Sequence, residues 1–179
     1  IKECDWSSDV CSSDLQGALP LSWTIAGAGD FDGDGTTDIL WRNLDSTTSS
    51  TVAISFMKDG AITRSIAVGA MPASSMIAGL DDFNGDGKTD LLWRHASGQV
   101  DLWTMDGATP LNTQVIANAT PDWTITGTGD FNGSGKSNIL WRGPNGVVTT
   151  WVMDGGAFLA SENAGYAPLN GPIRKAAAE

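Results

Sequence analysis

The chain has 179 residues, of which 41% are hydrophobic and 17% are charged, and its formal net charge is −11. This length is sufficient for one domain with a sizeable core. The acidity argues against a nucleic-acid partner, because phosphate binding needs a basic patch. The sequence contains no apolar run of the roughly 18 residues that predict a membrane-spanning helix.

Residues 1–15 differ in character from everything that follows them. The stretch DWSSDVCSSDL, from Asp5 to Leu15, matches one reading frame of a common short-read sequencing adapter residue for residue. We therefore expect residues 1–15 to be non-native, with any native signal peptide upstream, and Cys4 and Cys11 to say nothing about the redox compartment. The alternative is a natural linker rich in Ser and Asp.

The rest of the chain consists of three repeats of about 50 residues. Each contains an acidic phrase, which reads DFDGDGTTD from Asp30, DFNGDGKTD from Asp82 and DFNGSGKSN from Asp130. The similarity extends to the segments WTIAGAGD, SMIAGLDD and WTITGTGD before the phrase and ILWR, LLWR and ILWR after it. We expect the repeats to span residues 16–73, 74–121 and 122–165, followed by a C-terminal tail over residues 166–179.

Each repeat predicts four short strands and no helix. In the first repeat, apolar residues alternate with small or polar ones over residues 23–26, and a short apolar run over residues 39–41 follows the acidic phrase. Alternation returns over residues 52–56, and residues 62–68 would form the fourth strand.

An Asp-Gly pair separates the last two predicted strands of every repeat. The pairs are Asp59-Gly60, Asp106-Gly107 and Asp154-Gly155. They predict hairpin turns, because both residue types tolerate positive φ.

Four strands in a repeat of this length are typical of a β-propeller blade. We therefore predict an all-β fold, a β-propeller fragment of about three four-stranded antiparallel blades with calcium loops. Known propellers close with roughly 4 to 8 blades. We accordingly expect the chain to be part of a larger propeller, with residues 16–20 as the remnant of an earlier blade and the remaining blades of the same propeller as partners.

The acidic phrases have the oxygen spacing of a metal-binding loop. Side-chain oxygens recur at positions 1, 3, 5 and 9, Gly at position 6 permits a sharp turn, and position 7 can add its backbone carbonyl. The predicted ligands are Asp30, Asp32, Asp34, Thr36 and Asp38; Asp82, Asn84, Asp86, Lys88 and Asp90; and Asp130, Asn132, Ser134, Lys136 and Asn138. Thr36, Lys88 and Lys136 would bind through their backbone carbonyls.

Oxygen-only, carboxylate-rich ligation favours Ca²⁺, since no His or Cys lies nearby for zinc or copper. An EF-hand is excluded, because Trp41 occupies position 12, where that motif needs a bidentate Glu. The third loop should be weak, since Ser134 and Asn138 replace acids and affinity follows the ligand charge. The alternative is a set of metal-free turns in which Asp and Asn bond their own backbone.

The stretch WTIAGAGDFDGDGTTDILWR resembles the FG-GAP/VCBS type of repeat of integrin-α-like propellers, and the resemblance extends from Trp23 to about Ser161. In that family the calcium loop joins two strands of a blade, and members are typically extracellular, cell-surface or secreted. The resemblance therefore implies a calcium-stabilised propeller that serves as an adhesion or ligand-binding module, or as an appendage of a larger secreted protein.

Recurring aromatic and basic residues are interpreted as structural. The tryptophans are expected to pack between blades, with sugar stacking as the alternative, and the arginines to make hydrogen bonds within each blade. His95, the single histidine, is expected to be a loop residue, and the sequence supports no catalytic Ser-His-Asp set. The recurring residues are Trp41, Trp93 and Trp141; Phe56, Trp103 and Trp151; and Arg42, Arg94 and Arg142.

These observations favour a non-catalytic, calcium-binding module of a secreted or cell-surface protein, with a binding, adhesion or display role and a protein or glycan ligand. One alternative is a carbohydrate-binding, lectin-like propeller. A second is an accessory domain of a secreted hydrolase or lyase whose catalytic residues lie elsewhere.

Overall fold

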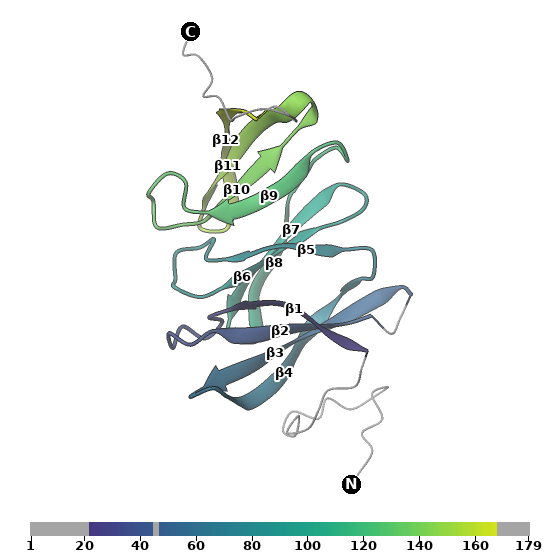
Figure 1. Ribbon diagram of the computed structural model, residues 1–179, viewed down its shortest axis with the longest axis vertical. Helices are drawn as coiled ribbons and strands as arrows, with labels where there is room; N and C mark the ends of the chain where they lie inside the picture. Colours follow the sequence, from purple (N-terminus) through teal and green to yellow (C-terminus); the bar gives the residue numbers. More distant parts are fainter. Residues whose placement is uncertain (1–21, 45–46, 168–179) are drawn as a thin grey trace.

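The computed structural model describes residues 22–44 and 47–167, so the predictions for residues 1–15 and for most of the C-terminal tail lie outside the described residues. The described part is all-β apart from a single 3₁₀ turn at Pro144–Gly146. It forms three four-stranded antiparallel sheets, stacked one after another along the long axis of the molecule (Figure 1). The predicted fold class is therefore confirmed.

Every sheet is built from four consecutive strands, and neighbours in the chain are neighbours in the sheet. The first contains β1 (Trp23–Gly29), β2 (Asp38–Asn43), β3 (Ser49–Lys58) and β4 (Ala61–Pro72). The second contains β5 (Met76–Asp81), β6 (Asp90–Arg94), β7 (Gln99–Asp106) and β8 (Thr109–Asn118). The third contains β9 (Thr124–Gly129), β10 (Asn138–Arg142), β11 (Val147–Asp154) and β12 (Ala157–Tyr166).

The core consists of two apolar layers, one on each side of the middle sheet. Successive residues of a strand point to opposite faces, so Leu91 and Trp93 of β6 lie in the layer shared with the first sheet. Leu92, between them, lies in the layer shared with the third sheet. A strand that is buried on both faces reads as a continuous apolar run, which explains the LLWR segment of β6.

The first strands of the three sheets run close together, β1 against β5 and β5 against β9 (Figure 1). Glycine permits this approach, since a Cβ added to Gly27 would lie 2.2 Å from Leu80 Cδ1 and one added to Gly79 would lie 2.6 Å from Thr128 Cγ2. A bulge between Ile25 and Gly27 interrupts the alternation of β1. Ile25 pairs with Trp41 on the face that no other described sheet covers, and it is 65% exposed.

The hairpin prediction holds for the first sheet and is displaced in the other two. Asp59 and Gly60 form the first turn, with φ of 52° and 78°. In the other sheets Asp106 and Asp154 are the last residues of β7 and β11, and the turns lie one step later, at residues 107–108 and 155–156.

The hairpins are equally long, because Lys58 pairs with Ala61 as Asp106 pairs with Thr109 and Asp154 with Ala157. The Asp-Gly pair of the first repeat lies one position later in the strand register, so the predicted equivalence of Phe56 with Trp103 and Trp151 is wrong. Cross-strand pairing sets Ser55 opposite Ile39, as it sets Trp103 opposite Leu91. Phe56 therefore points to the other face, where it is buried in the layer between the first and second sheets. A shift of one residue reverses the face of a strand residue.

Candidate metal centre

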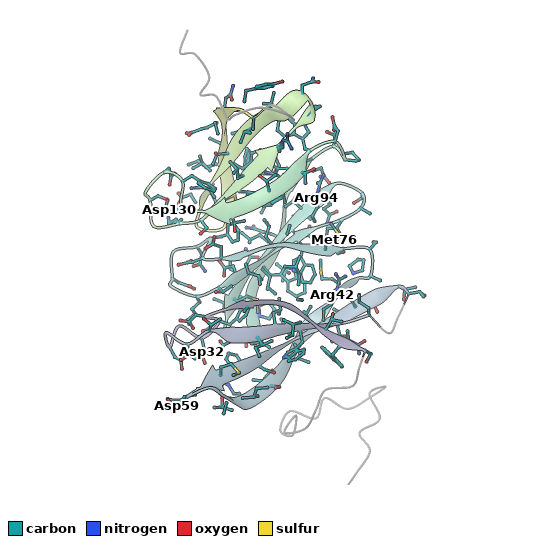
Figure 2. The ribbon with its side chains drawn as sticks, viewed as in Figure 1. Asp32, Arg42, Asp59, Met76, Arg94 and Asp130 are labelled. Atoms are coloured by element: carbon teal, nitrogen blue, oxygen red, sulfur yellow. The ribbon has the colours of Figure 1, made fainter. Side chains whose placement is uncertain are left out.

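The three acidic phrases form the loops between β1 and β2, β5 and β6, and β9 and β10. They project from the same edge of the stack, one above another (Figure 1). Figure 2 labels Asp32 in the first loop and Asp130 in the third.

The first residue of the phrase organises the turn. The Asp30 carboxylate accepts hydrogen bonds from the backbone N–H groups of residues 33, 34 and 35 at 2.7, 3.2 and 2.8 Å. The chain can wrap around one carboxylate in this way because Gly33 and Gly35 adopt φ of 76° and 84°. Asp82 accepts the equivalent bonds in the second loop, at 2.6, 3.2 and 2.7 Å.

The last residue of the phrase ties the loop to the sheet. Asp38 is 1% exposed, and its two carboxylate oxygens accept the backbone N–H groups of Phe31, at 3.0 Å, and of Met57 in β3, at 2.9 Å. Asp90 repeats the arrangement with residues 83 and 105, both at 2.9 Å. Sequence reasoning identified these residues as candidate ligands but missed their structural role, because residue 57 is remote in the chain.

The carboxylates of the first loop converge. One oxygen each from Asp30, Asp32 and Asp38 lie within 4.8 Å of one another. Ligand oxygens that each lie 2.3–2.6 Å from a Ca²⁺ ion are separated by at most about 5 Å, so the set fits that cation. Asp34 is exposed, and its Oδ1 accepts the backbone N–H of Thr36 at 2.8 Å.

One oxygen in this cluster lacks a donor. Asp32 Oδ2 pairs with the Arg64 guanidinium at 3.3 Å, whereas Asp32 Oδ1 is shielded from solvent and receives no hydrogen bond among the described residues. A shielded carboxylate oxygen without a donor is costly. A cation between Asp30, Asp32 and Asp38 would satisfy it.

Burial and mutual repulsion disfavour the ionised form of the position-9 carboxylates. Burial raises the pKa of Asp90 to about 6, and the charges of Asp86 and Asp82 add to the rise, while the bonds from residues 105 and 83 oppose it. Burial, with the charges of Asp32 and Asp30, raises the pKa of Asp38 as well. A positive charge in each loop would favour the ionised carboxylate and so lower the pKa of Asp90 and of Asp38.

The second loop differs at position 3, where Asn84 replaces an acid. Its side chain accepts the backbone N–H of Asp86 at 2.8 Å and donates to the Asp86 carboxylate at 3.0 Å. Asp86 Oδ1 also accepts the backbone N–H of Lys88 at 2.8 Å. The loop therefore keeps three carboxylates, those of Asp82, Asp86 and Asp90.

The third loop keeps a single carboxylate, and an amide takes the place of the acid at position 9. Asn138 accepts the backbone N–H of Met153 at 3.0 Å and donates its side-chain amide to Asn132 Oδ1 at 3.3 Å. Asp130 is the one remaining carboxylate, and backbone N–H groups, that of Gly135 first, lower its pKa. That this loop is the weakest of the three stays a prediction.

Adjacent loops are joined to one another. The backbone N–H of Thr89 donates to the Asp30 carbonyl, and that of Ser137 donates to the Asp82 carbonyl, both at 2.7 Å. Lys88, predicted to contribute only its backbone carbonyl, also pairs its ammonium group with Asp106 at the hairpin of its own sheet. Lys136 pairs with Asp154 in the same way.

His95 is more constrained than the sequence suggested. Its Nδ1 lies 2.9 Å from Ser75 Oγ and its Nε2 lies 2.8 Å from Asp101 Oδ2. This hydrogen-bonded chain of Ser, His and Asp resembles a catalytic triad. Ser75 is fully buried, however, so no substrate can reach its hydroxyl. The three side chains form a structural network at one end of the second sheet, where Ser75 precedes β5, His95 follows β6 and Asp101 lies in β7.

Stacked four-stranded antiparallel sheets, each with an acidic loop between its first two strands, define a repeat protein of the propeller-blade class. Residues 22–55 match the FG-GAP repeat family, and residues 82–141 match the FG-GAP-like repeat family. The chain therefore belongs to the FG-GAP repeat proteins, as the sequence resemblance implied. A comparison with curated proteins finds no match. In the described part of the chain, no helix is long and apolar enough to cross a membrane.

Proposed function

We propose that the chain is a calcium-binding FG-GAP repeat module in which the first two acidic loops each hold one Ca²⁺ ion and the third binds weakly or not at all. The observation that carries this proposal is Asp32 Oδ1, a shielded oxygen without a donor inside a cluster of three converging carboxylates. The raised pKa of Asp90 supports the same conclusion for the second loop.

A bound cation would stabilise the attachment of the acidic loop to its own sheet. Asp38 and Asp90 already join the loop to the third strand of their sheets. Neutralising the surrounding carboxylates removes the repulsion that opposes this arrangement. The role that follows is stabilisation of a rigid, non-catalytic binding, adhesion or display module of a secreted or cell-surface protein, with a protein or glycan as its ligand.

Calcium titration of the chelator-treated chain by calorimetry tests the proposal. We expect saturable binding, which Asp32→Asn should abolish at the first loop and Asp86→Ala should weaken at the second. Asp59→Asn is the matched control, because it removes a carboxylate of the first hairpin turn that belongs to none of the predicted ligand sets. Absence of binding heat, together with equal melting temperatures in calcium and in chelator, would show that the loops are metal-free turns.

A carbohydrate-binding role is the second candidate, and one recess favours it. A cavity of about 320 Å³ lies between the second and third sheets, where the indoles of Trp123, Trp141 and Trp151 meet hydroxyl and amide side chains that include Asn118 and Ser161. Aromatic faces combined with hydrogen-bonding groups suit a sugar ring. A glycan array tests this role, and Trp151→Ala should remove any signal that arises at the recess.

A further inference from the structure

Arg64 lies in β4 and reaches the first acidic loop. Its guanidinium lies 3.3 Å from Asp32 Oδ2 and is, among the described residues, the one basic group that forms an ion pair with a predicted ligand carboxylate. The other oxygen of that carboxylate, Asp32 Oδ1, is shielded from solvent and receives no hydrogen bond in the part of the chain that the structure describes. The ion pair therefore uses one oxygen of Asp32 and leaves the shielded oxygen open to a cation.

The guanidinium is held in place by its own hairpin. Arg64 lies opposite Phe56 of β3, and its Cζ lies 4.1 Å from the centre of the Phe56 ring. The ring is 2% exposed, so it is a fixed platform on which the guanidinium rests through a cation–π contact. A bulge adds Thr63 to β4 just before Arg64, and the Thr63 hydroxyl donates to the carbonyl of Phe56 at 3.1 Å. Bulges redirect side chains in this way.

The same hairpin also holds a second carboxylate of the first loop. Asp38 accepts the backbone N–H of Met57, which follows Phe56 in β3, at 2.9 Å. The hairpin of β3 and β4 therefore fixes Asp32 and Asp38, two of the three carboxylates that converge in this loop.

The other two repeats have no basic residue at the position of Arg64. Cross-strand pairing places Asn112 of β8 and Ala160 of β12 there. The loops of both repeats also have asparagine at position 3, where the first loop has Asp32. The acid at position 3 and the arginine that pairs with it therefore occur together, in the first repeat.

An asparagine at position 3 can be held by its own loop. The Asn84 side chain donates its amide to the Asp86 carboxylate at 3.0 Å. An ionised aspartate has no such donor, and the neighbouring carboxylates repel it. Asp32 therefore needs a donor from outside the loop, and Arg64 supplies it.

We propose that Arg64 is a positioning residue of the first calcium site, which holds Asp32 with Oδ1 free for the cation and so raises the affinity of this loop for Ca²⁺. This role rests on the proposed calcium-binding function. Partners that orient a metal ligand typically account for about 10–100-fold in metal affinity. The charge of Arg64 opposes a cation, but its side chain is 55% exposed, so solvent screens the repulsion and orientation outweighs it.

Calcium titration of the chelator-treated 179-residue chain by calorimetry tests the proposal. Asp86→Ala is present throughout, so that the first loop dominates the binding curve. Arg64→Ala should weaken binding at the first loop by about 10-fold, the lower end of the range for an orienting partner. Arg64→Lys keeps a charged donor but loses the planar guanidinium, so it should restore part of the loss. A residue needed only for its bulk would show no such rescue.

Lys58→Ala is the matched control for charge. Lys58 is exposed at the end of β3, on the same hairpin as Arg64, and forms no ion pair among the described residues. Its replacement removes one positive charge and should not weaken calcium binding. Circular dichroism must show that every variant is folded.

The possible results separate the role of Arg64 from calcium binding itself. A folded Arg64→Ala chain that binds calcium as tightly as its parent, or more tightly, overturns the proposal and leaves the calcium-binding function standing. An equal loss of affinity in Lys58→Ala overturns it as well. Absence of calcium binding by the wild-type chain overturns both the role of Arg64 and the proposed function.

Discussion

Asp90→Asn separates the structural role of the second loop from its metal-binding role. A rise in pKa from 3.8 to about 6 means that ionised Asp90 costs the folded state roughly 3 kcal/mol at neutral pH, a cost that asparagine avoids. Asparagine keeps an acceptor for the N–H of Met105, as Asn138 does for Met153. It presents its NH₂ group to the buried N–H of Phe83, which loses its acceptor at a cost of about 1–3 kcal/mol.

These two effects oppose each other, so the variant should melt in chelator within a few degrees of the wild type. In calcium the wild type gains roughly 2.7 kcal/mol per site at a hundredfold excess over Kd. At about 2–4 °C per kcal/mol for a chain of this size, the variant should lose about 5–11 °C of the calcium-dependent rise in Tm.

Thermal melting followed by circular dichroism, in chelator and in calcium, measures both quantities. Asp59→Asn, at the first hairpin, controls for the loss of one carboxylate and should keep the full calcium-dependent rise. An Asp90→Asn variant that gains as much from calcium as the wild type would refute the assignment of Asp90 as a ligand.

The other predictions concern pH, the third loop and the close approach of the first strands. Because burial raises the folded-state pKa of Asp90 to about 6, the stability that protonated Asp90 gives in chelator is fully present below pH 4 and is lost as the pH rises through about 6. The Tm of chelator-treated protein should therefore fall between pH 5 and 7, and Asp90→Asn should flatten this fall. The double variant Ser134→Asp with Asn138→Asp should add a calorimetrically detectable calcium site, because it restores the charge of the third loop; an unchanged stoichiometry would contradict this. Gly27→Ala should lower the unfolding free energy by about 1–3 kcal/mol in urea titrations, because its Cβ would meet a leucine of β5 at 2.2 Å. Gly127→Ala, at the same position of the third sheet, should have a much smaller effect, because no atom lies within 4 Å of the added Cβ.

The sequence predicted the features that depend on neighbours in the chain. The twelve strands follow from local alternation and turn residues, and the candidate ligands of each loop lie within nine residues, so one short phrase contains them all. The prediction that the third loop binds metal weakly also depends on the sequence alone, because it follows from the replacement of acids at Ser134 and Asn138.

The sequence could not predict features that depend on pairing between distant strands. The Asp-Gly pair of the first hairpin lies one position later in the strand than its counterparts, so Phe56 is on the opposite face from the one its sequence position suggests, and only the cross-strand register shows this. The contact of His95 with Ser75 was missed for the same reason, since the two residues are brought together by the pairing of β5 with β6, 20 residues apart in the chain.

The sequence by itself determined that this protein is a stack of repeated four-stranded sheets with acidic loops, because hydrophobic period, turn chemistry and ligand spacing are local properties of the chain. The tertiary structure alone decided that Asp38 and Asp90 join their loops to a strand remote in the chain, and that Trp93 and Trp141 pack against Arg42 and Arg94 of the preceding sheets. Burial and complementarity arise only when the sheets are packed, and no single repeat contains both halves of the interface that joins it to its neighbours.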